Sequence, residues 1–135
     1  MSVLSVLVAA AAVYILGALW YSPVLFGNKW ITLMGIKIDK KKQEQMKKKA
    51  VKGYIGTFFA NIVMALVLSF FVTFSGAANF VEGMALGAIT WLGFLATTSL
   101  GSIFWEGRPF ALYLLNTSHH LVSLSLMGGI LAVLS

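Results

Sequence analysis

The side chains best suited to chemistry in this sequence gather in its last apolar segment. At 100° per residue, a helix would place five of them on one face: Tyr113, Asn116, His120, Ser123 and Met127. An imidazole changes charge near neutral pH and can carry a proton, and amide and hydroxyl groups beside it can set its orientation. Asn61 and Thr98, on two other apolar segments, are the expected partners of this face.

Two interpretations of these polar residues stay open. Polar groups at membrane depth are costly, which favours a polar path or binding site built from Asn61, Thr98, Asn116, His120 and Ser123. On this interpretation His120 exchanges a proton or contacts a ligand, and Asn116 and Ser123 orient it. The alternative is that these side chains only form hydrogen bonds between helices and stabilise the bundle.

The sequence offers little for catalysis or metal binding. Glu82 and Glu106 are some 24 residues apart, or roughly 36 Å along a helix, so they cannot act on one bond. His119 and His120 would point about 100° apart on a helix, and the chain has no third His and no Cys. We therefore predict no enzyme activity, no bound metal and no cofactor.

Four long runs must position these polar residues. They cover residues 1–28, 53–81, 83–105 and 109–135 of a chain that is 59% hydrophobic and 10% charged. Each run can supply the roughly 20 apolar residues that cross a membrane. We predict one domain, 1–135, with spans at about 3–20, 54–74, 82–105 and 110–134. For the first of these spans, a cleaved signal peptide is the alternative interpretation. The expected fold class is an all-α, integral membrane, up-and-down four-helix bundle.

Nine of the ten basic residues lie in segment 29–52, which has only two acidic residues, Asp39 and Glu44. Beside two spans, such a segment predicts a cytoplasmic loop that contacts anionic lipid headgroups, and it argues against nucleic-acid binding. With four spans Arg108 falls on the same side, so both termini are expected outside. We also expect a charged helix with Asp39 as its N-cap, which ends or breaks at Gly53.

Aromatic residues also concentrate at the expected cytoplasmic end. We define the cytoplasmic mouth by six residues: Trp20, Tyr21, Trp30, Trp105, Glu106 and Arg108. Aromatic belts usually occupy both membrane borders, so this asymmetry predicts a recognition site at one of them. The alternative is that Glu106 and Arg108 pair with each other, or with Lys29, and only hold the turn together.

Gly83 and Gly87 form a GxxxG pattern in the third apolar run. Small residues at this spacing let another helix approach closely, and larger residues continue the same stripe: Trp91, Phe94, Thr98, Gly101 and Trp105. The pattern predicts either close packing within one chain or a homo-oligomer. We keep both interpretations open.

Several local strings are distinctive: Leu19-Trp20-Tyr21-Ser22-Pro23, Leu25-Phe26-Gly27, Gly93-Phe94, Glu106-Gly107-Arg108-Pro109, and Asn116 to His120 before Met127-Gly128. Together, in this order and over nearly the whole chain, they resemble domain-of-unknown-function family 1761. The lysine-rich stretch 37–52 looks least like the family. The resemblance implies a small, mostly bacterial, four-span protein of the inner membrane, and it carries no known reaction, cofactor or catalytic residue.

Two functions from different classes remain. One is a small oligomeric transporter or channel with a polar path through the membrane. The other is a non-catalytic membrane interaction or assembly module, which binds lipid or a protein partner at its cytoplasmic face. The expected partners are anionic lipid headgroups at the basic segment and, for a homo-oligomer, further copies of the chain.

Overall fold

A computed structural model describes residues 2–37 and 39–134 of the chain. These residues form helices and the segments that connect them. The helices are α1 (Val3–Trp20), α2 (Gly27–Met34), α3 (Lys40–Ser75), α4 (Phe80–Thr90), α5 (Gly101–Phe104) and α6 (Phe110–Leu134). Between α4 and α5 lie a π-helical turn, Trp91–Ala96, and a short 3-10 turn, Thr98–Leu100. No strand occurs in the described ranges. The predicted all-α fold class is confirmed.

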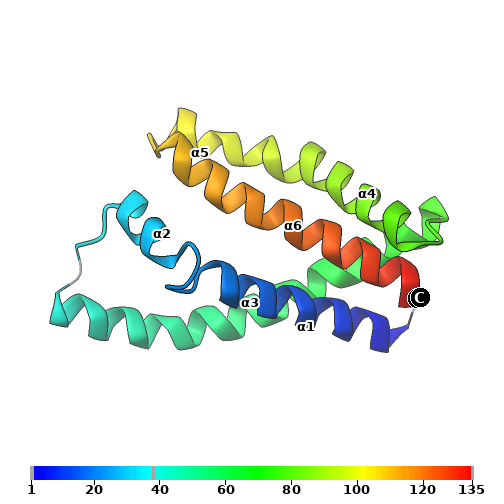
Figure 1. Ribbon diagram of the computed structural model, residues 1–135, viewed down its shortest axis with the longest axis horizontal. Helices are drawn as coiled ribbons and strands as arrows, with labels where there is room; N and C mark the ends of the chain where they lie inside the picture. Colours follow the sequence, from blue (N-terminus) through cyan, green and yellow to red (C-terminus); the bar gives the residue numbers. More distant parts are fainter. Residues whose placement is uncertain (1, 38, 135) are drawn as a thin grey trace.

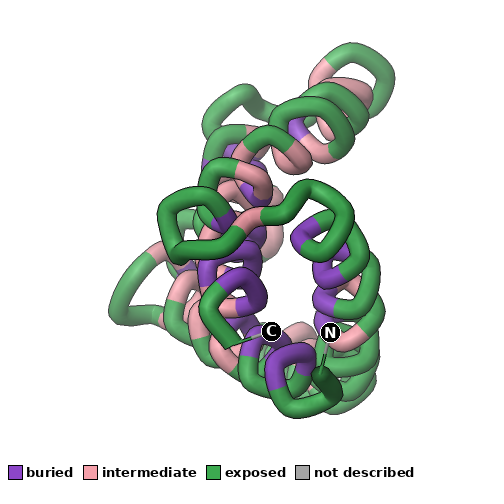
Figure 2. The backbone as a smooth tube through the Cα atoms, turned by 90° about the vertical axis from the view of Figure 1, so that its right-hand side faces the viewer, coloured by how far each residue is buried: buried purple, intermediate pink, exposed green. Residues whose placement is uncertain are grey.

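Four stretches are long and apolar enough to cross a membrane: Val3–Trp20, Lys40–Ser75, Phe80–Phe104 and Phe110–Leu134. They correspond to the four predicted spans. The start of α1 and the end of α6 lie at the same end of the bundle, while the lysine-rich start of α3 and the turn before α6 lie at the other end (Figures 1 and 2). Four antiparallel passes require this arrangement, since each pass reverses the direction of the chain.

Helix α3 is longer than the sequence led us to expect. It continues without interruption for 36 residues, so the charged helix and the second span are one element, and the predicted end or break at Gly53 is wrong. The predicted cap is present, because the Asp39 carboxylate accepts a hydrogen bond from the backbone N–H of Lys42 at 2.7 Å. At 1.5 Å per residue α3 is about 54 Å long, well beyond a hydrocarbon core of about 30 Å. Its lysine-rich turns therefore extend out of the membrane.

Helix α6 is the central helix of the bundle. It contacts α1, α3 and α4 and reaches α2 and α5 at one end (Figure 1). The core forms where α1, α3 and α6 meet, around fully buried Val13, Leu68, Met127 and Leu131. Although a short turn joins α3 to α4, these two helices make few contacts, and α4 packs on α6 instead. The second and third spans are therefore not closely packed on each other, although they follow one another in the chain.

Glycines bring α4 and α6 together. A Cβ atom at Gly83 would collide with the carbonyl oxygen of Gly128, and one at Gly87 would collide with that of Leu124. The GxxxG pattern thus serves packing within one chain. Trp91 continues the predicted stripe, since it packs against the core. Phe94 and Trp105 do not: they are 65% and 90% exposed, because the π-helical turn changes the helical register after Thr90.

Candidate functional site

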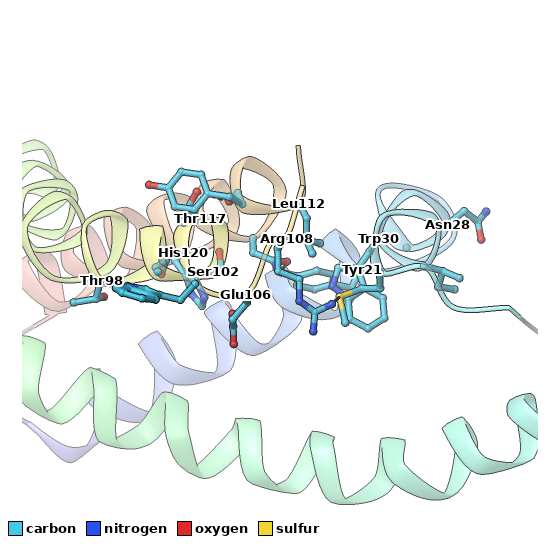
Figure 3. Close-up of a pocket in the computed structure, with 18 of the residues that line it drawn as sticks. Tyr21, Asn28, Trp30, Thr98, Ser102, Glu106, Arg108, Leu112, Thr117 and His120 are labelled. Carbon is cyan, nitrogen blue, oxygen red and sulfur yellow. Dashed lines mark hydrogen bonds between the residues drawn. The ribbon is translucent and has the colours of Figure 1, made fainter. Parts of the chain in front are cut away.

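A cavity of about 1030 Å³ opens at the lysine-rich end of the bundle (Figure 3). Its walls come from the turn after α1, from α2, α3 and α5, and from the first half of α6. The polar and aromatic side chains that line it are Tyr21, Asn28, Trp30, Thr98, Ser99, Ser102, Trp105, Glu106, Arg108, Tyr113, Asn116, Thr117 and His120. A cavity of this size, with mixed polar and apolar walls, is typical of ligand-binding sites.

A tight turn after α1 shapes one wall of this cavity. Pro23 cannot continue the helix, and the chain reverses through a backbone hydrogen bond from Gly27 N–H to the Ser22 carbonyl at 2.9 Å. Gly27 is required here, because a Cβ would lie 2.5 Å from the carbonyl oxygen of Tyr21. Helix α2 then ends at Gly35, whose φ of 72° is a left-handed conformation that favours glycine. This places Trp30 over the ring of Tyr21, at a centroid separation of 6.2 Å.

Two hydrogen bonds fasten this turn to α6. The hydroxyl of Tyr21 donates to Asn116 Oδ1 at 2.8 Å, and the indole N–H of Trp20 donates to the carbonyl of Leu115 at 3.2 Å. Burial raises the pKa of Tyr21 to about 12. The phenol is therefore neutral at physiological pH and keeps its proton for the bond to Asn116.

The irregular segment between α4 and α5 forms the opposite wall. The Tyr113 hydroxyl donates to the carbonyl of Ala96 at 2.6 Å, and the indole N–H of Trp91 donates to the carbonyl of Thr117 at 2.8 Å. The Thr98 hydroxyl bonds the carbonyl of Phe94 in its own segment. Irregular backbone is tolerated at membrane depth where such groups satisfy it and where it borders a cavity.

Charged side chains lie at the rim. Glu106 and Arg108 extend in the same direction from the turn before α6, away from that helix (Figure 3). The Arg108 guanidinium lies against Met34, with Nη1 3.5 Å from the sulfur. Because a guanidinium has five N–H donors, this contact leaves most of them free for a ligand.

A second cavity, of about 470 Å³, lies between α1, α3 and α6. Tyr21, Pro23 and His120 line both cavities, so they form the partition between them. Asn61 lines the second cavity and is 6% exposed.

The structure separates the predicted path residues into three places. Thr98, Asn116 and His120 line the larger cavity, Asn61 lines the second, and Ser123 lines neither. The expectation that Ser123 orients His120 is wrong: its hydroxyl lies 3.3 Å from Nε2 of His119. Residues four apart lie one above the other on a helix, which brings the Ser123 hydroxyl under the His119 ring.

His119 itself occupies a close contact with α1. Gly17 leaves room for the ring, since a Cβ there would lie 3.2 Å from Nε2. The ring of Tyr21 meets that of His119 at 5.2 Å, and the ring of Trp20 meets it at 5.8 Å. Neither interpretation of the polar residues in the sequence assigned a role to His119.

Of the cytoplasmic mouth, Tyr21, Trp30, Trp105, Glu106 and Arg108 line the larger cavity. Trp20 does not; its ring packs on Phe26, at 4.8 Å, and on His119. Sequence reasoning missed three further kinds of lining residue: Met34 and Met46, Ser99 and Ser102, and Leu112. The apolar ones look like lipid-facing residues, and nothing in their spacing shows that α2 folds over the cavity.

The far half of α6 contains no continuation of the cavity. Beyond His120 this helix buries a closely packed series of residues: Ser123, Leu124, Met127, Gly128, Leu131 and Ala132. The 14 residues from His120 to Leu134 span about 21 Å. The larger cavity is therefore open at one end of the bundle and closed by the core toward the other.

Comparison with known proteins agrees with the family resemblance. Neither the curated proteins nor the solved structures gave a match to this chain. The model of the family described as "Protein of unknown function (DUF1761)" matches residues 4–132, nearly the whole length. The chain, a multi-pass membrane protein by its four apolar helices, therefore belongs to this family of unknown function.

Proposed function

We propose that this protein is a non-catalytic binding module of the membrane, which takes the headgroup of an anionic amphiphile into the larger cavity from its lysine-rich side. The observation that carries the proposal is the form of the cavity. It is about 1030 Å³ in volume, it has charged and aromatic groups at its rim, and it ends at His120 against a packed core. A cavity that is open at one end suits binding better than conduction through a single chain.

The chemistry of the rim supports an anionic headgroup. Arg108 offers several free N–H donors, and guanidinium groups bind phosphate and carboxylate oxygens in a bidentate manner. The lysines at the start of α3 project beyond the membrane and raise the local concentration of anions. Tyr21 and Trp30 supply rigid aromatic surface of the kind that lies at headgroup level.

The test is lipid retention by the purified protein. The protein is first placed in nanodiscs of phosphatidylcholine and phosphatidylglycerol and is then extracted from them. The phospholipids that remain bound to it are measured by native mass spectrometry. We expect retained phosphatidylglycerol and about tenfold weaker retention in Arg108→Gln, since a hydrogen bond to a charged group is lost. Lys29→Gln is the matched control, because Lys29 carries the same charge on α2 but is not one of the residues that line the cavity. Equal loss in both variants, or none, contradicts the proposal.

Transport is the second candidate function. It is favoured by the polar groups that follow one another from Asn116 through His120 to Asn61, across the partition between the two cavities. A complete path would need the packed half of the bundle to open or further copies of the chain to contribute. Proteoliposome flux over a panel of ions and protons tests it: flux that His120→Ala abolishes supports transport, and absence of flux in the folded protein opposes it.

Orientation, location and assembly belong to the same proposal. The lysine-rich segment and the turn before α6 lie at one end of the bundle. This excess of positive charge supports the proposal that this end is cytoplasmic and that both termini are outside. We propose the bacterial inner membrane as the location. Homo-oligomerisation stays a prediction, and it would have to use a surface other than Gly83 and Gly87, which contact α6 of the same chain.

A further inference from the structure

The second cavity differs from the first in the chemistry of its walls. Its volume of about 470 Å³ lies within the range of small-molecule sites. None of the described residues that line it is Lys, Arg, Asp or Glu. A charged ligand would lose its hydration there without a counter-ion, which is strongly unfavourable. Any ligand of this cavity is therefore uncharged.

Some of the polar side chains that line this cavity have no hydrogen-bond partner within residues 2–37 and 39–134. The Asn61 side chain is 6% exposed and faces the cavity, yet its amide forms no hydrogen bond with any residue in ranges 2–37 and 39–134. At 1.5 Å per residue, Asn61 lies about 10 Å inside α3 from Tyr54, at membrane depth. An amide buried there without a partner is costly, so it calls for a partner in the cavity.

The lining groups without hydrogen-bond partners in the described ranges include residues of three different helices. Tyr14 on α1 and His120 on α6 face the same space as Asn61 on α3, and neither forms a hydrogen bond within the described part of the chain. A phenol and a carboxamide N–H₂ are donors, so together they favour a ligand that presents acceptor oxygens. The ring of Tyr14 is held edge-on to Tyr54, at 6.5 Å, and to Phe58, at 5.8 Å, which makes a rigid aromatic wall.

We infer that the second cavity is a separate binding site for an uncharged, planar carbonyl compound dissolved in the membrane, of which a quinone ring is the chemical type. Its oxygens accept hydrogen bonds from Tyr14 and Asn61, and its ring lies against the tyrosine wall. Tyr54, which is 57% exposed, stands where the cavity reaches the surface. A hydrophobic tail leaves the site there and stays in the lipid. This site is independent of the headgroup site proposed for the larger cavity.

The test is equilibrium binding of a decyl-substituted benzoquinone to the protein in nanodiscs of phosphatidylcholine, measured by quenching of tryptophan fluorescence. Trp20 reports on the site, because its ring lies 5.8 Å from that of His119, a lining residue. We expect saturable quenching that excess decylbenzene, which has the tail but no carbonyl, does not displace. Empty nanodiscs with a free tryptophan analogue measure the quenching due to partition alone.

Asn61→Leu is the decisive variant, because leucine keeps the volume and removes the amide. We expect its dissociation constant to rise roughly two- to tenfold, the effect of one lost hydrogen bond. Asn28→Leu, the same exchange in the larger cavity, is the matched control and should leave the affinity unchanged. Tyr14→Phe, which retains the ring, provides a second variant if Asn61→Leu does not fold, and should weaken binding by the same order.

Three outcomes would overturn the inference. One is quenching that does not saturate, which means partition into lipid. Another is equal affinity in the native protein, Asn61→Leu and Tyr14→Phe. The last is displacement by decylbenzene, which shows that the carbonyl oxygens contribute nothing and that water fills the polar part of the cavity.

Discussion

The hydroxyl of Tyr21 donates a hydrogen bond of 2.8 Å to Oδ1 of Asn116, across 95 residues of sequence. This bond joins the turn after α1 to the first half of the central helix α6, and Tyr21 stands in the partition between the two cavities. The hydrogen bond holds one wall of the larger cavity in place. The strength of this bond can be measured directly.

Removal of the bond should destabilise the protein modestly. We expect Tyr21→Phe to lower the free energy of unfolding by about 1 kcal/mol, the net worth of one hydrogen bond. Asn116→Leu should cost more, because it leaves a buried phenol O–H without an acceptor. A double-mutant cycle in detergent micelles, followed by denaturant unfolding, isolates the coupling. Strictly additive losses would show that the two side chains do not interact.

The same tyrosine predicts a pH dependence. Its pKa of about 12 in the folded protein lies above the ordinary value of 10.0, which applies to the unfolded chain. Below pH 10 the phenol is protonated in both states, so its contribution to stability is fully present there. As the pH rises from 10 to 12 the unfolded state loses the proton first, and this contribution is progressively lost. Unfolding curves of the native protein and Tyr21→Phe should therefore converge over this window, and curves that stay parallel would contradict the assignment.

Because α4 packs closely on α6, an added methyl group should destabilise the protein at a glycine in this contact and not at a glycine outside it. Gly87→Ala should lower the free energy of unfolding by about 1–3 kcal/mol, because its Cβ would collide with the carbonyl of Leu124. Gly93→Ala is the control, since a Cβ there meets nothing within 4 Å. Unfolding in mixed micelles compares the two. If both variants had the same stability, α4 and α6 would not be in this contact.

The orientation of the bundle can be read with single cysteines, because the natural chain has none. We expect a membrane-impermeant thiol reagent, added to intact cells, to label Ala78→Cys in the turn before α4 and to spare Lys47→Cys on α3. Permeabilised cells should label both, which controls for reactivity. Labelling of Lys47→Cys alone in intact cells would reverse the assignment of inside and outside.

Much of the architecture was readable from local composition. A charge in hydrocarbon is so unfavourable that the placement of lysines and the length of the apolar runs reveal the four passes. The N-cap at Asp39 is equally local, since it depends on one carboxylate and the N–H three residues later. The sequence also brought Tyr21, Trp30, Glu106 and Arg108 to one end, where they do line a cavity.

Local composition is thus enough to predict the solvent of this protein, the number of its passes and the end at which its charged and aromatic groups meet. Three features needed the packed structure: α4 packs on α6 rather than on α3, Ser123 contacts His119 rather than His120, and α2 folds over a cavity. They could not be predicted because lipid tails and neighbouring helices are equally apolar. Hydrophobic periodicity therefore cannot distinguish the face that meets lipid from the face that meets protein, and close packing selects the partners.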